Sequence, residues 1–173
     1  MSFRILIADD HGVLRAGLHA LLSIEPDLEV VGEAADGREV LRLARELNPD
    51  LVLLDLVMPG LGGIEVTRQL KKLLPDTRVL ILTVHEDASL ASEALQAGAA
   101  GYLIKRAVES ELINAIHAVC RGDLYLHPAL TRALLRNLPS APASSVPSLS
   151  SLGRSSSCAS LPRDAPVVRS PRS

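Results

Sequence analysis

The chain has 173 residues, of which 47% are hydrophobic but only 2% aromatic, so its length and composition suit one aliphatic-cored domain plus an appendage. Residues 140–173 carry four arginines and one aspartate, a charge of +3, which leaves −5 on the remainder of a chain of net charge −2 and argues against nucleic-acid binding by that acidic part. No apolar stretch is long enough to span a bilayer, and the two cysteines lack zinc or redox spacing, so we expect a cytoplasmic protein without membrane contact.

Short apolar runs alternate along the chain with segments of helical periodicity. Buried strands are expected at residues 5–8, 28–32, 51–54, 79–82 and 101–104, and helical spacing of apolar residues covers 12–23, 40–47, 64–74, 88–97 and 109–121. Continuous apolar runs are typical of strands that are covered on both faces, as in a parallel sheet. Five such alternations predict an α/β fold with a five-stranded, doubly wound parallel sheet that closes by about residue 121.

The run at residues 51–54 is the most informative, because it leads directly into Asp55 and then into the turn signal at Pro59 and Gly60. An ionised side chain is costly to bury in an aliphatic core, so Asp55 is expected at the carboxyl end of its strand. In open α/β sheets this edge is where ligands bind. Asp55 is therefore the first candidate functional residue.

Polar residues also follow three other expected strands: Asp9 and Asp10 after the first, Thr83 after the fourth and Lys105 after the fifth. Carboxylates that gather at one edge of a sheet repel one another unless a cation compensates. A hard divalent ion such as Mg²⁺ meets that need with oxygen ligands, Lys105 offers a point charge for a phosphate oxygen, and Thr83 offers a hydroxyl donor. A carboxylate nucleophile, a metal and a lysine are the parts needed to form an aspartyl phosphate on Asp55.

These motifs, DD, D-x-x-M-P-G, T and K at successive strand ends, resemble the response-regulator receiver domain, which has a CheY-like, flavodoxin-like fold, over residues 3–121. The resemblance implies that Asp55 accepts a phosphoryl group from a sensor histidine kinase in a two-component system. It also implies that Asp10 and Asp55 bind Mg²⁺ directly, together with the backbone carbonyl of Val57, while Asp9 acts through water. The family is one of signalling switches, so we do not expect an enzyme.

The same resemblance assigns a switching role to two further residues. Thr83 and Lys105 match residues that contact the phosphoryl oxygens, and Tyr102 matches an aromatic that changes rotamer when Thr83 moves inward. A cis peptide bond between Lys105 and Arg106 is implied as well. A second copy of the chain is a candidate partner in a homodimer, and full-length relatives control transcription by binding DNA.

Other interpretations of the pocket fit less well. A haloacid-dehalogenase-like phosphatase also uses a strand-end aspartate with Mg²⁺, but that family has a D-x-D pattern, in which an acid two residues after the nucleophile acts as general acid and base. Position 57, two residues after Asp55, is Val here. No G-x-G-x-x-G motif follows the first strand, which argues against a dinucleotide-binding module. His11 and His85 flank the pocket and are interpreted as residues at helix starts rather than as phosphate relays.

The C-terminal part is expected to differ from the rest. We expect a receiver domain at residues 1–121, a linker with a short helix at 122–139, and a tail at 140–173. The linker resembles the one that leads to a helix-turn-helix domain in the NarL/FixJ (LuxR-type) subfamily, but that output domain is not recognisable in the tail. Twelve serines and five prolines among the last 34 residues predict disorder.

A frameshifted or truncated reading frame is favoured for this tail over a natural flexible segment. On that interpretation the chain itself does not bind DNA. A stand-alone receiver or phosphate sink, or a truncated product without function, are then the alternatives to a response regulator that controls transcription.

Overall fold

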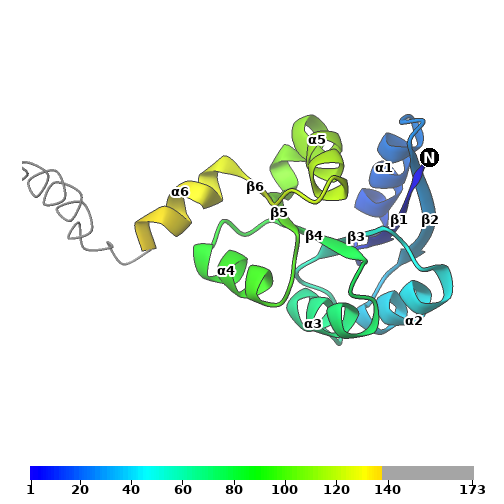
Figure 1. Ribbon diagram of the computed structural model, residues 1–173, viewed down its shortest axis with the longest axis horizontal. Coiled ribbons are helices and arrows are strands. Elements are labelled where there is room, and N and C mark those ends of the chain that lie inside the picture. Colours follow the sequence, from blue (N-terminus) through cyan, green and yellow to red (C-terminus); the bar gives the residue numbers. More distant parts are fainter. Residues whose placement is uncertain (138–173) are drawn as a thin grey trace, which may run out of the picture. The chain divides into compact units, whose positions relative to one another are not determined.

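The computed structural model of the protein describes residues 1–137 (Figure 1). The strands are β1 (Phe3–Ala8), β2 (Leu28–Ala34), β3 (Leu51–Asp55), β4 (Arg78–Thr83), β5 (Gly101–Ile104) and β6 (Tyr125–Leu126). The helices are α1 (Gly12–Ser23), α2 (Gly37–Leu47), α3 (Gly63–Leu73), α4 (Ala88–Gln96), the 3-10 turn η1 (Lys105–Ala107), α5 (Val108–Cys120) and α6 (Pro128–Asn137). The predicted disorder of residues 140–173 and the proposed frameshift or truncation lie outside the described residues.

The strands form one parallel sheet in the order β2-β1-β3-β4-β5-β6. This confirms the doubly wound parallel sheet, but the predicted number of five strands is wrong, because the described residues form six. The additional strand, β6, has only two residues, which pair with Gly101 and Tyr102 of β5. A strand of that length leaves no apolar run that a sequence pattern can detect.

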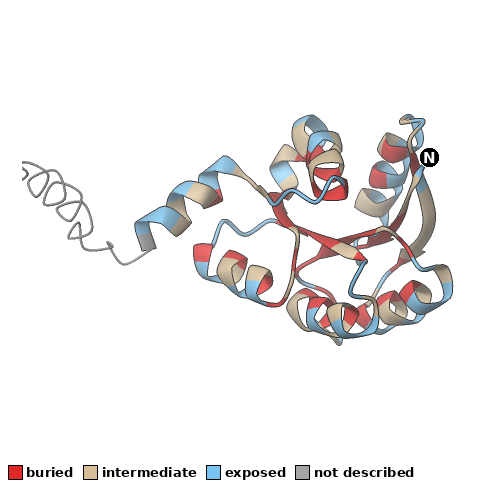
Figure 2. Ribbon diagram, in the orientation of Figure 1, coloured by how far each residue is buried: buried red, intermediate tan, exposed pale blue. Residues whose placement is uncertain are grey.

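The sheet is covered on both faces, and the core is divided accordingly into two clusters (Figure 1). Alternate residues of β1 point to opposite sides: Ile5 and Ile7 belong to the cluster that α1 and α5 cover, and Leu6 belongs to the one that α2, α3 and α4 cover. Figure 2 shows the central strands β1, β3, β4 and β5 largely buried between helices whose outer faces are exposed, whereas the edge strands β2 and β6 are mostly half-buried. No helix within residues 1–137 combines the length and the apolar character needed to cross a bilayer.

Helix α2 illustrates how local chemistry sets the element boundaries. At its start the Asp36 carboxylate accepts a hydrogen bond from the N–H of Glu39 at 2.9 Å, and the Glu39 carboxylate accepts one from the N–H of Ala35 at 2.9 Å. The first bond satisfies a donor in the first turn that the helix itself leaves without a partner, and the second fixes the chain just before the N-cap, in an arrangement related to the capping box. At its end Asn48 adopts a left-handed conformation with φ of 46° and Pro49 follows, so the helix stops where the sequence predicts.

Candidate functional site

The carboxyl ends of four neighbouring strands bring the expected polar residues to one edge of the sheet. Asp9 and Asp10 follow β1, Asp55 ends β3, Thr83 ends β4 and Lys105 follows β5. Strand β1 lies between β2 and β3, so the strand order reverses there, and this is the position at which ligands bind in doubly wound sheets. The sequence therefore correctly predicted that these residues lie at one edge of the sheet. The distances between their side chains depend on the register of the strands, which only the folded structure provides.

Lys105 joins two buried carboxylates. Its Nζ atom donates hydrogen bonds to Asp9 Oδ2 at 2.7 Å and to Asp55 Oδ2 at 2.9 Å. The side chains of Asp9, Asp55 and Lys105 are 1%, 5% and 10% exposed. Two carboxylates share one ammonium group, so a negative charge remains in a place that water scarcely reaches. Such a site favours a further cation.

The ionisation of this group reflects both burial and pairing. Burial raises the pKa of Asp55, and the bond from Lys105 offsets that rise only in part. Burial lowers the pKa of Lys105, but the contacts with Asp9 and Asp55 outweigh it, so the pKa of Lys105 is raised overall. Lys105 therefore remains a permanent cation, whereas Asp55 keeps its charge at a cost in free energy.

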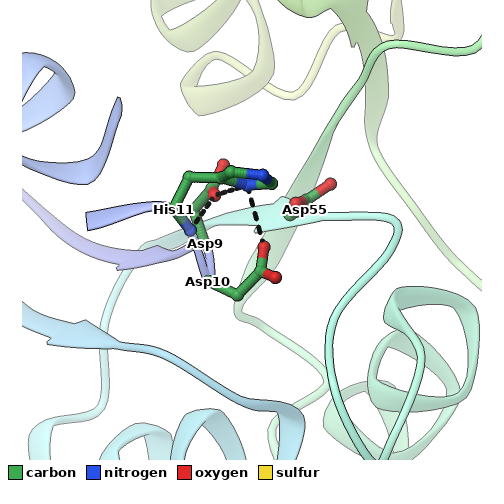
Figure 3. Close-up of side chains that lie close together, drawn as sticks. All are labelled: Asp9, Asp10, His11 and Asp55. Carbon is green, nitrogen blue, oxygen red and sulfur yellow. Dashed lines mark hydrogen bonds and ion pairs between the residues drawn. The ribbon is translucent and has the colours of Figure 1, made fainter. Parts of the chain in front are cut away.

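Asp10 and His11 lie at the outer side of the pocket (Figure 3). The His11 Nδ1 atom is 2.9 Å from Asp10 Oδ1 and 3.1 Å from Asp9 Oδ1, and the His11 backbone N–H donates to Asp9 Oδ1 at 2.8 Å. One ligand atom from each of Asp9, Asp10, His11 and Asp55 lies within 4.8 Å of all the others. His11 is the N-cap residue of α1, as predicted, but its side chain turns to the carboxylates rather than to the helix.

The β3–α3 loop completes the wall around Asp55. The N–H of Val57 donates to Asp55 Oδ1 at 3.2 Å, which orients the carboxylate from the strand end. Gly63 begins α3 so close to β3 that an added Cβ atom would lie 2.5 Å from the backbone oxygen of Asp55. Only glycine permits this approach, and the loop can therefore close tightly around the acid.

Thr83 and Tyr102 lie beside the acidic group and are not part of it. Thr83 is buried, and its Oγ1 atom accepts a hydrogen bond from the backbone N–H of His85 at 3.0 Å. Tyr102 is fully buried, and its hydroxyl makes no hydrogen bond of standard geometry within residues 1–137. Burial raises the pKa of Tyr102, and the nearby Thr83 hydroxyl offsets this in part. Both side chains are thus enclosed on adjacent strands.

Sequence analysis did not single out a polar chain that supports the Asp9 end of the pocket, formed by Arg15, Glu33 and His19. Arg15 donates from Nη1 to the backbone oxygen of Asp9 at 2.7 Å and from Nε to Glu33 Oε2 at 3.0 Å. His19 Nδ1 lies 2.6 Å from Glu33 Oε1, and this contact, with Arg15, lowers the pKa of Glu33. Arg15 and His19 are four residues apart and so share one helix face, which was the available signal.

A second expectation from the sequence, the cis peptide bond, is wrong. The peptide bond between Lys105 and Arg106 is trans, as are all peptide bonds within the described residues.

A doubly wound parallel sheet with a carboxylate-rich pocket at its reversal point defines the class of this protein. Residues 5–117 match the response regulator receiver domain, and the chain belongs to that family. This confirms the resemblance found in the sequence.

Similar proteins include both response regulators and transcriptional regulators. The chain is 44% identical over 131 residues to the response regulator GacA of Pseudomonas viridiflava and 40% identical over 135 residues to the transcriptional regulatory protein DegU of Brevibacillus brevis. These alignments cover 76% and 78% of this chain but only 61% and 57% of those relatives. A crystal structure of a LuxR-family response regulator from Aurantimonas sp. superposes with a TM-score of 0.76 at 39% identity, over 79% of this chain and 97% of that one.

Proposed function

We propose that the chain is the phosphorylation switch of a two-component system, in which Asp55 accepts a phosphoryl group from a sensor histidine kinase. The observation that carries this proposal is the position of Asp55, a buried carboxylate at a strand end that Lys105 contacts and Asp9 and Asp10 surround. A structural ion pair would balance its charges, whereas this pocket retains an excess of negative charge that a cation must neutralise.

The transfer needs one nucleophile and a means of holding negative charge. An oxygen of the Asp55 carboxylate attacks the phosphorus of a phosphohistidine, a P–O bond forms, and the P–N bond breaks with its electron pair on the departing imidazole. Lys105 contacts the incoming phosphoryl oxygens, and Thr83 offers its hydroxyl to another. The chain acts here as the acceptor of the phosphoryl group.

The donor atoms of the pocket fit a magnesium ion. Asp9, Asp10 and Asp55 supply the carboxylate oxygens that Mg²⁺ prefers, and these lie within 4.8 Å of one another. Asp10, Asp55 and the backbone carbonyl of Val57 are the proposed direct ligands, and Asp9 acts through water. When bound, Mg²⁺ would neutralise charge on the phosphoryl group and on the Asp55 carboxylate that accepts it.

The output is proposed through Thr83 and Tyr102. Phosphorylation draws Thr83 toward Asp55, which favours the inward position of Tyr102 on the adjacent strand. The relatives named above are response and transcriptional regulators, and the chain spans 57% to 61% of their length. We therefore propose DNA binding, control of transcription and homodimerisation for proteins of the relatives' full length, in which a receiver domain of this kind forms only one part. Its place of action is the cytoplasm, where a histidine kinase delivers the phosphoryl group.

Incubation with acetyl phosphate and Mg²⁺ tests the central step. We expect the mass increase of one phosphoryl group, its loss on treatment with hydroxylamine, and no labelling of Asp55→Asn or in the presence of EDTA. Asp76→Asn is the matched control, because Asp76 is an exposed aspartate in the α3–β4 loop. Labelling that persists in Asp55→Asn would overturn the assignment.

A further inference from the structure

Strand β6 and helix α6 are hereafter called the C-terminal arm, and β6 pairs with β5, the strand that carries Tyr102. The arm belongs to the same compact unit as the rest of residues 1–137. In Figure 1 it leaves the end of α5, passes the edge of the sheet at β5 and continues beyond it as α6. Helix α6 packs against α4, which lies on the same face of the sheet as the side chain of Tyr102. The arm therefore closes the sheet edge beside the proposed switch.

Backbone hydrogen bonds fix the arm to β5 at Tyr102 and to Ala100, just before that strand. The N–H of Tyr125 donates to the oxygen of Ala100 at 3.2 Å, and the N–H of His127 donates to the oxygen of Tyr102 itself at 3.2 Å. The register places Leu126 opposite Tyr102. A movement of Tyr102 that shifts the backbone of β5 is thus transmitted directly to the arm.

One leucine gives the arm its hold on the core. Leu130 is 0% exposed and belongs to the same hydrophobic cluster as Tyr102, Ala91 and Ala94. Leu135 lies on the same helix but is 62% exposed. Alanines on the buried face of α4 leave space beside that helix, and the Leu130 side chain packs into this space from α6. Without Leu130 this cluster, and Tyr102 within it, loses part of its cover.

Helix α5 anchors the other side of the arm. Tyr125 Oη donates to Glu111 Oε2 at 2.5 Å, and His127 Nε2 lies 3.8 Å from Glu111 Oε1. Burial and the bond to Glu111 raise the pKa of Tyr125 to about 12, so the phenol remains a donor at neutral pH. The Nδ1 atom of His127 accepts from the N–H of Ala129 at 3.2 Å and so caps α6. The arm is held in a defined position.

We propose that the docked C-terminal arm and the inward position of Tyr102 stabilise each other, so that phosphorylation of Asp55 favours docking of the arm. The inference rests on the proposed roles of Asp55 and Tyr102. The buried Tyr102 hydroxyl lacks a hydrogen bond of standard geometry within the described residues and is compensated only in part by the nearby Thr83 hydroxyl, which disfavours the inward position. The packing of Leu130 in the same cluster offsets that cost. Coupling is reciprocal: whatever favours the inward Tyr102 also favours docking of α6.

The first test compares Leu130→Ala with Leu135→Ala in the metal-free protein. The chain contains two tyrosines and no tryptophan, so on a Tyr125→Phe background Tyr102 is its only tyrosine. This background loses the bond to Glu111 equally in every variant and keeps the backbone pairing of β6 with β5, so the two alanine variants are still compared like for like. We expect acrylamide to quench Tyr102 fluorescence more strongly in Leu130→Ala and to have the parental effect in Leu135→Ala. Leu130→Met, which keeps the volume, is expected to restore protection. Equal quenching in the two alanine variants, with both folded by circular dichroism, would overturn the coupling to Tyr102.

The second test uses beryllofluoride with Mg²⁺ as a mimic of the phosphoryl group. We expect it to slow amide hydrogen exchange in α6 of the unmodified chain, and Leu130→Ala to weaken its binding by about fivefold or more. Slowed exchange around Asp55 without any change in α6 would overturn the coupling. No effect in either region would instead overturn the acceptor role of Asp55, while the quenching test still decides whether the arm holds Tyr102.

Discussion

The acidic pocket and the C-terminal arm both meet β5, but different forces hold them. At the end of β5, Lys105 joins Asp9 and Asp55 through ionic hydrogen bonds of 2.7 and 2.9 Å. Along the same strand, Tyr102 lies in an aliphatic cluster that Leu130 of the arm completes. We therefore expect the pocket to respond to charge: to protons and, on the proposed function, to metal ions and phosphoryl groups. We expect the arm to respond chiefly to volume and packing, with the bond from Tyr125 to Glu111 as a polar contribution.

This difference shows how a short strand can connect a chemical event to a mechanical one. Electrostatic interactions in the pocket act over several ångströms and change when a single charge is added. Aliphatic packing acts only at contact and has discrete arrangements, so it converts a small displacement into a docked or undocked helix. Substitutions that alter charge without volume, and volume without charge, should therefore separate the two regions.

The largest effect is expected from Lys105→Met, which removes the cation and keeps most of the aliphatic stem. We expect labelling by acetyl phosphate to slow by about 100-fold, because one preorganised partner of the transferred phosphoryl group is lost. Mg²⁺ binding, measured by calorimetry, should persist or tighten, since the metal no longer competes with an ammonium group for Asp9 and Asp55.

Lys72→Met is the matched control, because Lys72 is an exposed lysine on α3. It should label at the parental rate. A Lys105→Met protein that also labels at that rate would show that the ammonium group serves only to neutralise the resting pocket.

A smaller effect is expected from Arg15→Ala. Arg15 holds the backbone oxygen of Asp9 at 2.7 Å and so fixes the turn that carries Asp9 and Asp10. Loss of such an outer contact weakens metal binding by about tenfold in comparable sites. Calorimetric titration with Mg²⁺ should show this change, while acrylamide quenching of Tyr102 in the metal-free protein should remain parental.

Arg42→Ala provides the comparison for Arg15, since Arg42 forms an exposed pair with Glu46 on α2 and contributes little. Equal Mg²⁺ affinities in the two variants would show that the turn holds its shape without Arg15.

The contrast between pocket and arm also explains what the sequence could reveal. Asp9, Asp55 and Lys105 each end an apolar run, and parallel strands must bring their carboxyl ends to one edge, so the composition of the pocket followed from pattern alone. Its geometry did not follow. Which carboxylate oxygens Lys105 reaches depends on the register between β1, β3 and β5, and this is a property of the whole sheet.

The arm was harder to predict because its interactions have no local signature. Strand β6 has two residues, and its pairing with β5 depends on where α5 ends. Leu130 and Leu135 are the same residue type on one short helix. Only the docking of α6 on α4 buries the first and leaves the second exposed. Likewise Arg15 and Glu33 form an ion pair between elements that no sequence period connects.

The smallest effect is expected from Asp55→Asn on stability in EDTA. Burial raises the pKa of Asp55, so its ionised form costs free energy in the folded chain. Asparagine keeps the shape and removes that charge. We expect the thermal midpoint at neutral pH to rise by about 3 °C, measured by circular dichroism or calorimetry. Asp76→Asn, an exposed substitution of the same chemistry, should leave the midpoint unchanged.

The pH dependence of this stabilisation identifies its source. As the pH rises, Asp55 in the unfolded chain releases its proton near the ordinary value of about 3.9, before the folded chain does, so the parent loses stability across the interval up to the raised folded pKa. The gap between Asp55→Asn and the parent should be absent below that interval and complete above it. A gap that stays constant with pH would assign the effect to packing. Leu130→Ala removes no titratable group, so its deficit should not follow the interval set by Asp55, and the two regions would then be separated by a single experiment.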